Sequence, residues 1–345
     1  MLVRNMLRAM PPEVELVYFG DPKAPVRPAG DRVLGAASMA YQPSLKNKLK
    51  MLGHMAGLGM GKLPLHGFFA PNRTSAATLD ILRRVRPSRP VMQTLPASTG
   101  CQSIARLLAR LDRVVVTSDW GREQLVASGI APGHIARVDP GVAMPASPPG
   151  PPVGQRRHVL FAGDLEREVG DRLIDVASAM AGLDDWILEI ATRPKGDEHE
   201  AVRARLIRAL GPAIEAGRVT IAGEVSSINE LFDRAAVQLY LASHARNKVD
   251  IPFVLLEGMA RGVPVAVVDA QPVGELLTLG RRQDLEVGVS LDPSRFRESA
   301  EDILALLRDA GRIERLGRAA RQLTGDCFSD TEMAAGYRRQ YEELS

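Results

Sequence analysis

The sequence predicts an α/β protein built from two Rossmann-like domains that face a central cleft. Short apolar runs rich in β-branched residues alternate with helical patterns, which indicates parallel sheets joined by right-handed crossovers. A segment rich in proline and glycine, residues 145–157, divides this alternation into two halves. The length of 345 residues suits about two domains.

The predicted strands and helices follow one another in each half. Before residue 145 the predicted strands are Val14–Phe19, Leu63–Phe69, Pro90–Leu95 and Arg113–Thr117. After residue 157 they are His158–Ala162, Trp186–Ala191, Val219–Ala222, Val237–Leu241 and Val263–Val268, with helices near 171–182, 200–216, 226–235 and 252–261. The chain opens on a helix-like segment, Leu2–Met10, so the first strand of the fold is either absent or replaced by another element.

Composition excludes several classes of protein. With 45% hydrophobic and 25% charged residues, the chain is neither disordered nor fibrous. Cys101 and Cys327 are too few for a disulfide framework, and we expect reduced thiols in a cytosolic protein. The sequence contains no apolar run of bilayer length and no signal-peptide pattern at its amino terminus.

Basic residues are concentrated in the first half of the chain. Residues 1–150 hold 19 Lys and Arg against 9 Asp and Glu, whereas the remaining residues hold 25 against 32. Such a charge can attract phosphates or an anionic membrane, and an ordinary solvated surface explains it equally well. Ser44–Met60 is a basic amphipathic stretch that can lie on a bilayer, although its glycines weaken a helix. Nucleic-acid binding is disfavoured because aromatic residues make up only 4%.

Five segments, taken in order, resemble the GT-B glycosyltransferases, specifically the large retaining family 4 of group 1. The segments are Val114–Val142, His158–Gly170, Val219–Leu231, Asp250–Val268 with Glu275, and Phe328–Leu344. The resemblance implies an acceptor-side domain at 1–144, a linker at 145–157 and a nucleotide-sugar-binding domain at 158–328. It also implies that the helix at 329–345 packs back on the amino-terminal domain.

The segment Asp250–Val268 is the most informative part of this resemblance. Asp250 and Pro252 suit a helix start and Gly262 a helix end, so free N–H groups would point at the ligand as an anion site. By resemblance, Glu257 accepts hydrogen bonds from the donor ribose. Gly163, in the glycine loop after the first strand of the domain, and Glu275 complete the implied donor contacts. A surface glutamate is the alternative interpretation of Glu257.

The sequence departs from the family at several of these positions. Val249 stands where the family has the first glutamate of its Glu-x7-Glu motif, and the adjacent Asp250 is either its catalytic substitute or a helix cap. Asp164 and Val169 replace the usual Arg and Lys of the phosphate clamp.

Other basic residues follow strand ends of the same sheet and could replace the missing clamp. Arg193 and Lys195 follow one strand and Lys248 follows another, so we predict that these three bind the diphosphate. Solvated loop cations are the alternative. In the first half, His66 lies near a predicted strand end and resembles the catalytic-side histidine of the family, although a packed histidine explains it as well.

The resemblance therefore implies a hexosyltransferase-like enzyme that moves a sugar from a nucleotide-diphosphate sugar to an acceptor hydroxyl with retention. We expect no cofactor and no metal site, a lipid-linked or polysaccharide acceptor, and a cytoplasmic protein with peripheral contact at the inner membrane face. Two alternatives stay open. One is a catalytically degenerate GT-B protein that acts as a binding or scaffold subunit. The other is an epimerase on the same frame, for which the sequence lacks a set of acid and base residues.

Overall fold

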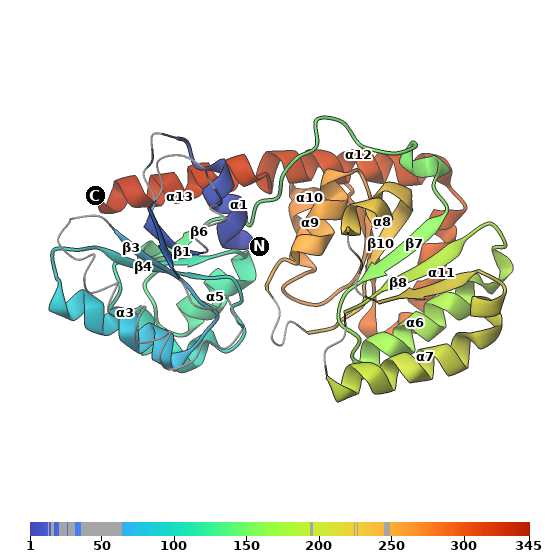
Figure 1. Cartoon of the computed structure of the whole chain (residues 1–345), viewed down its shortest axis with the longest axis horizontal. Helices are drawn as coiled ribbons and strands as arrows, with labels where there is room; N and C mark the ends of the chain where they lie inside the picture. Colours follow the sequence, from blue (N-terminus) through green and yellow to red (C-terminus); the bar gives the residue numbers. More distant parts are fainter. Residues whose placement is uncertain are drawn as a thin grey trace. The chain divides into compact units, whose positions relative to one another are not determined.

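The computed structural model describes residues 64–345 except 194–195, 224, 226 and 245–248, together with residues 1–12, 14, 17–20, 26 and 32–35. The chain divides into two units, the first being Met1–Gly141 with Asp330–Ser345 and the second Val142–Ser329 (Figure 1). The division places residues 142–157, including the segment interpreted as a linker, in the second unit. The closing helix belongs to the first unit.

The first unit contains a four-stranded parallel sheet in the order β3-β4-β5-β6. Its strands are β3 (Leu65–Phe68), β4 (Val91–Leu95), β5 (Arg113–Val116) and β6 (Ile135–Arg137), and its helices include α3 (Arg73–Val85), α4 (Ala105–Leu108) and α5 (Asp119–Ala127). Apolar residues of these helices and of the sheet form one core. Two further strands, β1 (Val17–Gly20) and β2 (Arg32–Gly35), pair with each other in parallel.

The first unit is completed by the two ends of the chain. The chain opens with helix α1 (Leu2–Ala9), as its sequence predicts, and helix α13 (Asp330–Leu344) lies beside it (Figure 1). The side-chain amide of Asn5 donates to the carbonyl oxygen of Gly141 at 2.8 Å. Tyr337 of α13 is fully buried, and its hydroxyl lies 3.2 Å from Thr94 Oγ1 in β4. The last helix therefore forms part of the core of a unit that begins at residue 1.

The second unit contains a six-stranded parallel sheet in the order β12-β11-β10-β7-β8-β9. The strands are β7 (His158–Ala162), β8 (Ile187–Ala191), β9 (Val219–Ala222), β10 (Ala235–Tyr240), β11 (Val265–Val268) and β12 (Gly288–Leu291). The chain builds outward from β7 to β9 and then crosses back to place β10 on the other side of β7. The strand order thus reverses between β7 and β10.

Helices cover both faces of this sheet, as Figure 1 shows. One face packs against α6 (Arg167–Ala179), α7 (Asp197–Glu215) and α11 (Phe296–Leu307). The other packs against α8 (Ile228–Arg234), α9 (Phe253–Ala260), α10 (Glu275–Arg282) and α12 (Ala310–Cys327). Neighbouring strand residues point to opposite faces, and helices cover both faces, so the strands are largely apolar rather than alternating.

Sequence reasoning did not predict three strands: β12 at the edge of the second sheet, and the short strands β2 and β6.

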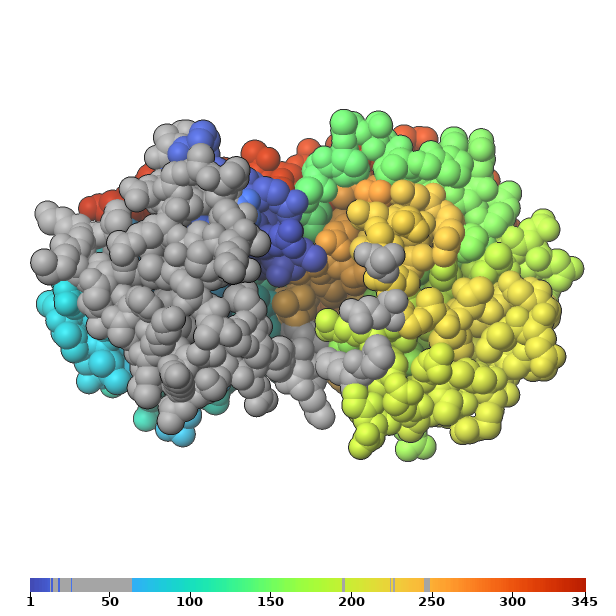
Figure 2. Space-filling view, in the orientation of Figure 1, coloured from blue at the N-terminus to red at the C-terminus, as the bar shows by residue number. Residues whose placement is uncertain are grey.

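Cys101 and Cys327 are both free thiols, the first of them buried. Among the described residues, no helix combines the length and the apolar character needed to cross a membrane. The proline-rich residues 145–152 lie along the upper edge of the second unit in Figure 2, where Ser147, Pro148 and Pro151 are exposed.

Candidate functional site

The reversal of strand order between β7 and β10 marks the point in the second unit where a ligand is expected. Ligands of open parallel sheets bind beyond the carboxyl ends of the strands, at the position where the order reverses. Two loops meet there, one that begins at Gly163 after β7 and one that begins at Leu241 after β10. The side chains of these loops define the candidate site.

Polar contacts join the two loops. His244 Nε2 lies 3.2 Å from Glu166 Oε2, and Ser243 Oγ donates to Glu168 Oε1 at 2.6 Å. Arg172 in α6 donates to the carbonyl oxygen of Leu241 at 2.6 Å and pairs with the same Glu168 carboxylate at 2.6 Å. Side chains from both sides of the reversal point are therefore held in one network.

Two buried hydroxyl oxygens beside this network, those of Thr192 and Tyr240, have no hydrogen-bond partner within the described part of the chain. Thr192 follows β8 and is only 4% exposed, and Tyr240 is the last residue of β10. Burial, together with the charges of Glu166 and Asp164, raises the pKa of Tyr240, so its hydroxyl stays neutral and able to donate. Buried polar atoms are normally satisfied, and these two mark a place where a polar ligand would supply partners.

The predicted phosphate clamp is described only at Arg193. Its side chain is 69% exposed, and its Nε lies 3.6 Å from Asp164 Oδ1, so the two residues form an ion pair. Lys195 and Lys248 lie outside the described residues. Val169, the other position at which the family has a cation, is a core residue of α6 with 1% exposure.

Helix α9 matches the helix predicted near 252–261, but its cap is not the predicted one. Its N-cap is Pro252, without a side-chain hydrogen bond, so the predicted cap, Asp250, lies two residues before it and is fully buried. The helix ends as predicted at Gly262, whose φ is +80°. There the N–H groups of Gly262 and Val263 donate to the carbonyl oxygens of Met259 and Gly258 at 2.9 and 3.0 Å. The amide of Leu255 donates to the carbonyl oxygen of Pro252 at 3.1 Å. The start of a helix leaves its first amides, here those of Phe253 and Val254, without an acceptor within the helix, which is the condition for binding an anion.

The other predicted donor contacts all lie at or near carboxyl ends of strands or helix starts of the second unit. Glu257 lies in the second turn of α9, where burial raises its pKa and the charge of Arg261 acts against that rise. Glu275 is the first residue of α10 and is 5% exposed. Gly163 is exposed just after β7, and its N–H donates to the carbonyl oxygen of Ala191 at 3.2 Å.

His66 lies inside a strand rather than at a strand end. It is the second residue of β3, and its ring nitrogens Nδ1 and Nε2 lie 2.7 Å from Tyr341 Oη and 2.8 Å from Thr94 Oγ1. Burial lowers the pKa of His66 to about 3, so the ring is neutral at physiological pH. Because both nitrogens are bonded to hydroxyls beneath α13, the geometry gives His66 a packing role instead of the predicted catalytic one.

No group of three or more His, Cys, Asp or Glu side chains that could hold a metal ion occurs in the part of the chain that the structure describes. The carboxylates near the reversal point are instead bonded to a histidine, a serine and arginines.

Comparison with known proteins identifies the fold. Residues 156–309 match the family model described as glycosyl transferases group 1. HepE of Anabaena, solved in complex with UDP, aligns with a TM-score of 0.74 and 14% identity over 99% of this chain and 95% of its own. The chain has the GT-B fold. Sucrose-phosphate synthase of Thermosynechococcus elongatus aligns at 0.70 with 19% identity over 96% and 88% of the two chains.

A further GT-B structure extends this comparison. The lipopolysaccharide outer core galactosyltransferase WaaB, in its apo form, aligns with a TM-score of 0.66 and 15% identity over 96% of this chain and all of its own. No curated protein matches the sequence. The range that matches the group 1 glycosyltransferase model lies within the second unit of this GT-B chain, and the candidate site described above lies within that range.

Several site residues of this GT-B chain were missed by sequence reasoning. Thr192 and Tyr240 were overlooked because single hydroxyls at strand ends carry no motif. The alternating acids Asp164, Glu166 and Glu168 were a usable signal, since three carboxylates between a strand end and the first turn of the next helix need nearby partners.

Proposed function

We propose that this chain is a glycosyltransferase that moves a hexosyl group from a nucleoside-diphosphate sugar to an acceptor hydroxyl, with retention of configuration. The observation that carries the proposal is the pair of buried, unpartnered hydroxyls, Thr192 and Tyr240, beside the point where the strand order reverses. The match of residues 156–309 to group 1 glycosyltransferases supports it, as do the UDP and UDP-glucose complexes of HepE.

In this proposal the donor lies on the second unit. The ribose hydroxyls donate to the carboxylate of Glu257, and the diphosphate is bound by the first-turn amides of α9 and by Arg193. Lys195 and Lys248 are included on sequence grounds alone. As the bond to the sugar breaks, negative charge grows on the leaving diphosphate, and these donors stabilise it without a metal or another cofactor. Glu275 and Gly163 line the donor, and Asp250 supports the start of α9.

The acceptor is proposed to be a saccharide, either lipid-linked or a polysaccharide. WaaB, which acts on the outer core of lipopolysaccharide, supports this class.

We also propose that the first unit contacts an anionic membrane. The predicted contact segment, Ser44–Met60, lies outside the described residues, but Ile81 and Val85 on α3 are 58% and 69% exposed, one turn apart and beside Arg84. Ile81→Ser with Val85→Ser should reduce co-flotation with anionic vesicles, and unchanged flotation would remove this contact.

A thermal-shift screen against UDP, GDP, ADP and their sugars tests donor binding. A ligand at 100 times its Kd stabilises the folded chain by about 2.7 kcal/mol, which raises the melting temperature measurably.

The carboxylates of Asp164 and Glu166, which pair with Arg193 and His244, favour the second candidate function, a degenerate scaffold. They place acidic groups where a diphosphate needs cations. No shift with any nucleotide at millimolar concentration would select the scaffold. Binding followed by release of nucleoside diphosphate on addition of acceptor would select the enzyme.

A further inference from the structure

The carboxyl end of α9 is held to α8 by a two-pronged ion pair. Arg261, the residue that follows α9, donates from Nε to Asp233 Oδ1 at 2.8 Å and from a terminal nitrogen to Asp233 Oδ2 at 3.0 Å. The two side chains are 16% and 31% exposed, so water screens the pair only in part. A fork of this kind fixes orientation as well as distance.

A second arginine joins α9 to residues 145–146. Arg321 in α12 donates to the carbonyl oxygen of Ala260, the last residue of α9, and to the carbonyl oxygens of Pro145 and Ala146. A third arginine, Arg156, is 4% exposed, and its guanidinium is surrounded by backbone carbonyl groups. The carbonyl oxygens that accept from it belong to Pro149, Pro151, Phe232 and Ala235.

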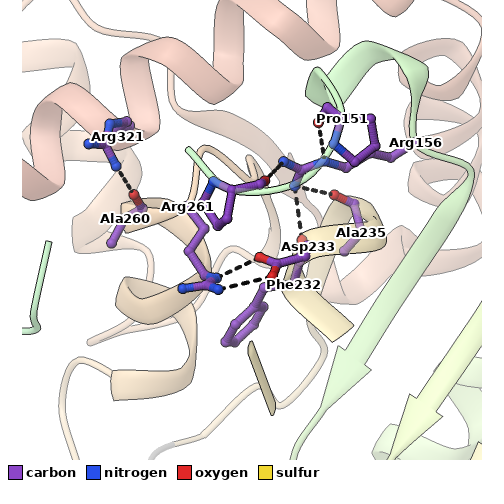
Figure 3. Close-up of polar contacts among 9 residues, drawn as sticks. Pro151, Arg156, Phe232, Asp233, Ala235, Ala260, Arg261 and Arg321 are labelled. Atoms are coloured by element: carbon purple, nitrogen blue, oxygen red, sulfur yellow. Dashed lines mark hydrogen bonds and ion pairs between the residues drawn. The ribbon is translucent and has the colours of Figure 1, made fainter. Parts of the chain in front are cut away.

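Figure 3 shows the three arginines with groups that they contact. Arg156 fixes the end of α8 and residues 149–151, Arg261 fixes α9 to Asp233 of α8, and Arg321 contacts the last turn of α9. The opposite end of α9 has no side-chain cap. Between the two ends of α9, the side-chain amide of Gln238 in β10 donates to the carbonyl oxygen of Leu255 at 2.9 Å. Together with the core packing of Leu255, Leu256 and Met259, the contacts at the carboxyl end fix the axial position and rotation of α9.

We propose that Arg261 and Asp233 are positioning residues that set the place of the Glu257 carboxylate for the donor ribose, an inference that rests on the proposed function. Glu257 and Arg261 are four residues apart, so they lie on the same side of the helix. The helix has only eight residues, and a rotation about its axis moves Glu257 directly. Hydrogen-bonding groups in a binding site must be held to within about 0.5 Å of the productive geometry.

The experiment measures nucleotide affinity well below the melting temperature. The dissociation constants of UDP, GDP and ADP are determined by titration calorimetry for the wild-type chain, Arg261→Lys and Asp233→Asn. Lysine keeps the charge but lacks the fork, so we expect the dissociation constant of the bound nucleotide to rise about 5- to 10-fold. The control is Arg205→Lys, which alters an ion pair with Asp171 between α7 and α6 and should leave affinity unchanged.

A double-mutant cycle separates positioning from general stability. If Arg261 acts through Glu257, then Arg261→Lys should have little further effect on affinity in a Glu257→Gln background. The exchanged pair, Arg261→Asp with Asp233→Arg, should recover part of the lost affinity, which also covers the case in which a single variant folds poorly. Two results would overturn the positioning role if the wild type still binds a nucleotide. One is that the affinity losses of Arg261→Lys and Glu257→Gln multiply in the double variant, and the other is that Arg261→Lys leaves the affinity unchanged. A wild-type chain that binds none of the three nucleotides would overturn the proposed function and this role together.

Discussion

Glu189 is a buried carboxylate in β8 that is held by two basic side chains. Its side chain is 5% exposed, and its Oε2 atom lies 3.1 Å from His158 Nδ1 and 2.9 Å from Arg234 Nε. Burial alone would raise the pKa of Glu189, but the hydrogen bonds and charges of His158 and Arg234 together outweigh it and lower the pKa to about 2.

The size and sign of this effect follow from linkage. The fall from the ordinary value of 4.5 to about 2 corresponds, at about 1.4 kcal/mol per pKa unit, to an upper limit of roughly 3 kcal/mol. Arg234 is 46% exposed, so solvent screening reduces this, and we expect about 1–3 kcal/mol. Because the pKa is depressed in the folded state, the stabilisation is complete above pH 4.5 and is lost as the pH falls from 4.5 towards 2.

Glu189→Gln should therefore lower the free energy of unfolding of the second unit by about 1–3 kcal/mol at pH 7, and the difference should shrink as the pH approaches 3. The second unit can be followed through Trp186, which is 7% exposed, in a Trp120→Phe background, because the chain has two tryptophans. Urea titrations at pH 7, 5 and 3.5 give the difference. Asp175→Asn, which breaks an exposed pair with Arg297, is the control and should cost less than about 0.5 kcal/mol. A difference between Glu189→Gln and wild type that does not change with pH would refute the reasoning.

Three further predictions concern α9 and α13. Gly258→Ala would place a methyl group 2.4 Å from Gln238 Oε1, so it should destabilise the second unit by about 1–3 kcal/mol in urea titration, and Gln238→Ala in the same chain should recover part. Deleting Asp330–Ser345 removes α13 from the first core and should abolish the cooperative unfolding transition reported by Trp120; a retained transition would show that α13 is dispensable. Binding of UDP should weaken as the pH falls through the raised pKa of Glu257, since a protonated carboxyl loses acceptor capacity. Calorimetry between pH 5 and 7.5 measures this, and the same pH dependence in Glu257→Gln would contradict it.

Most of the second unit could be predicted from the sequence because its strands are buried on both faces. Such strands read as short continuous apolar runs, and His158–Ala162 matches β7 in both bounds. Val219–Ala222 also matches the edge strand β9 in both bounds, although Thr220 within it is exposed. The edge strand β12 escaped prediction because Gly288 opens it. A Cβ at Gly288 would lie 2.0 Å from the carbonyl oxygen of Val265, so close approach to β11 requires glycine, which reads as a turn in sequence.

The candidate site was harder to predict because its geometry depends on contacts between distant residues. Asp250 was interpreted as the cap of α9 from its capping propensity, yet the N-cap is Pro252 and Asp250 is fully buried two residues before it. His66 was interpreted as a site residue because it resembles the strand-end histidine of the family. Its partner Tyr341 is 275 positions away, and no local pattern indicates that pairing. The three arginines around α9 bind mostly carbonyl groups, which leave no trace in the sequence.

The distribution of the first unit over both ends of the chain has a consequence for biosynthesis. The backbone N–H of Val142 donates to the carbonyl oxygen of Phe328 at 2.8 Å, so the second unit is a continuous insertion whose two ends meet. On the ribosome, all residues of the second unit have been made once Ser329 is added. The first unit, although translated earlier, lacks the helix that covers His66 until residues 330–345 follow. Because domains generally fold as units during synthesis, the later-encoded unit is the first that can finish folding, and the amino-terminal unit waits until residues 330–345 have been made.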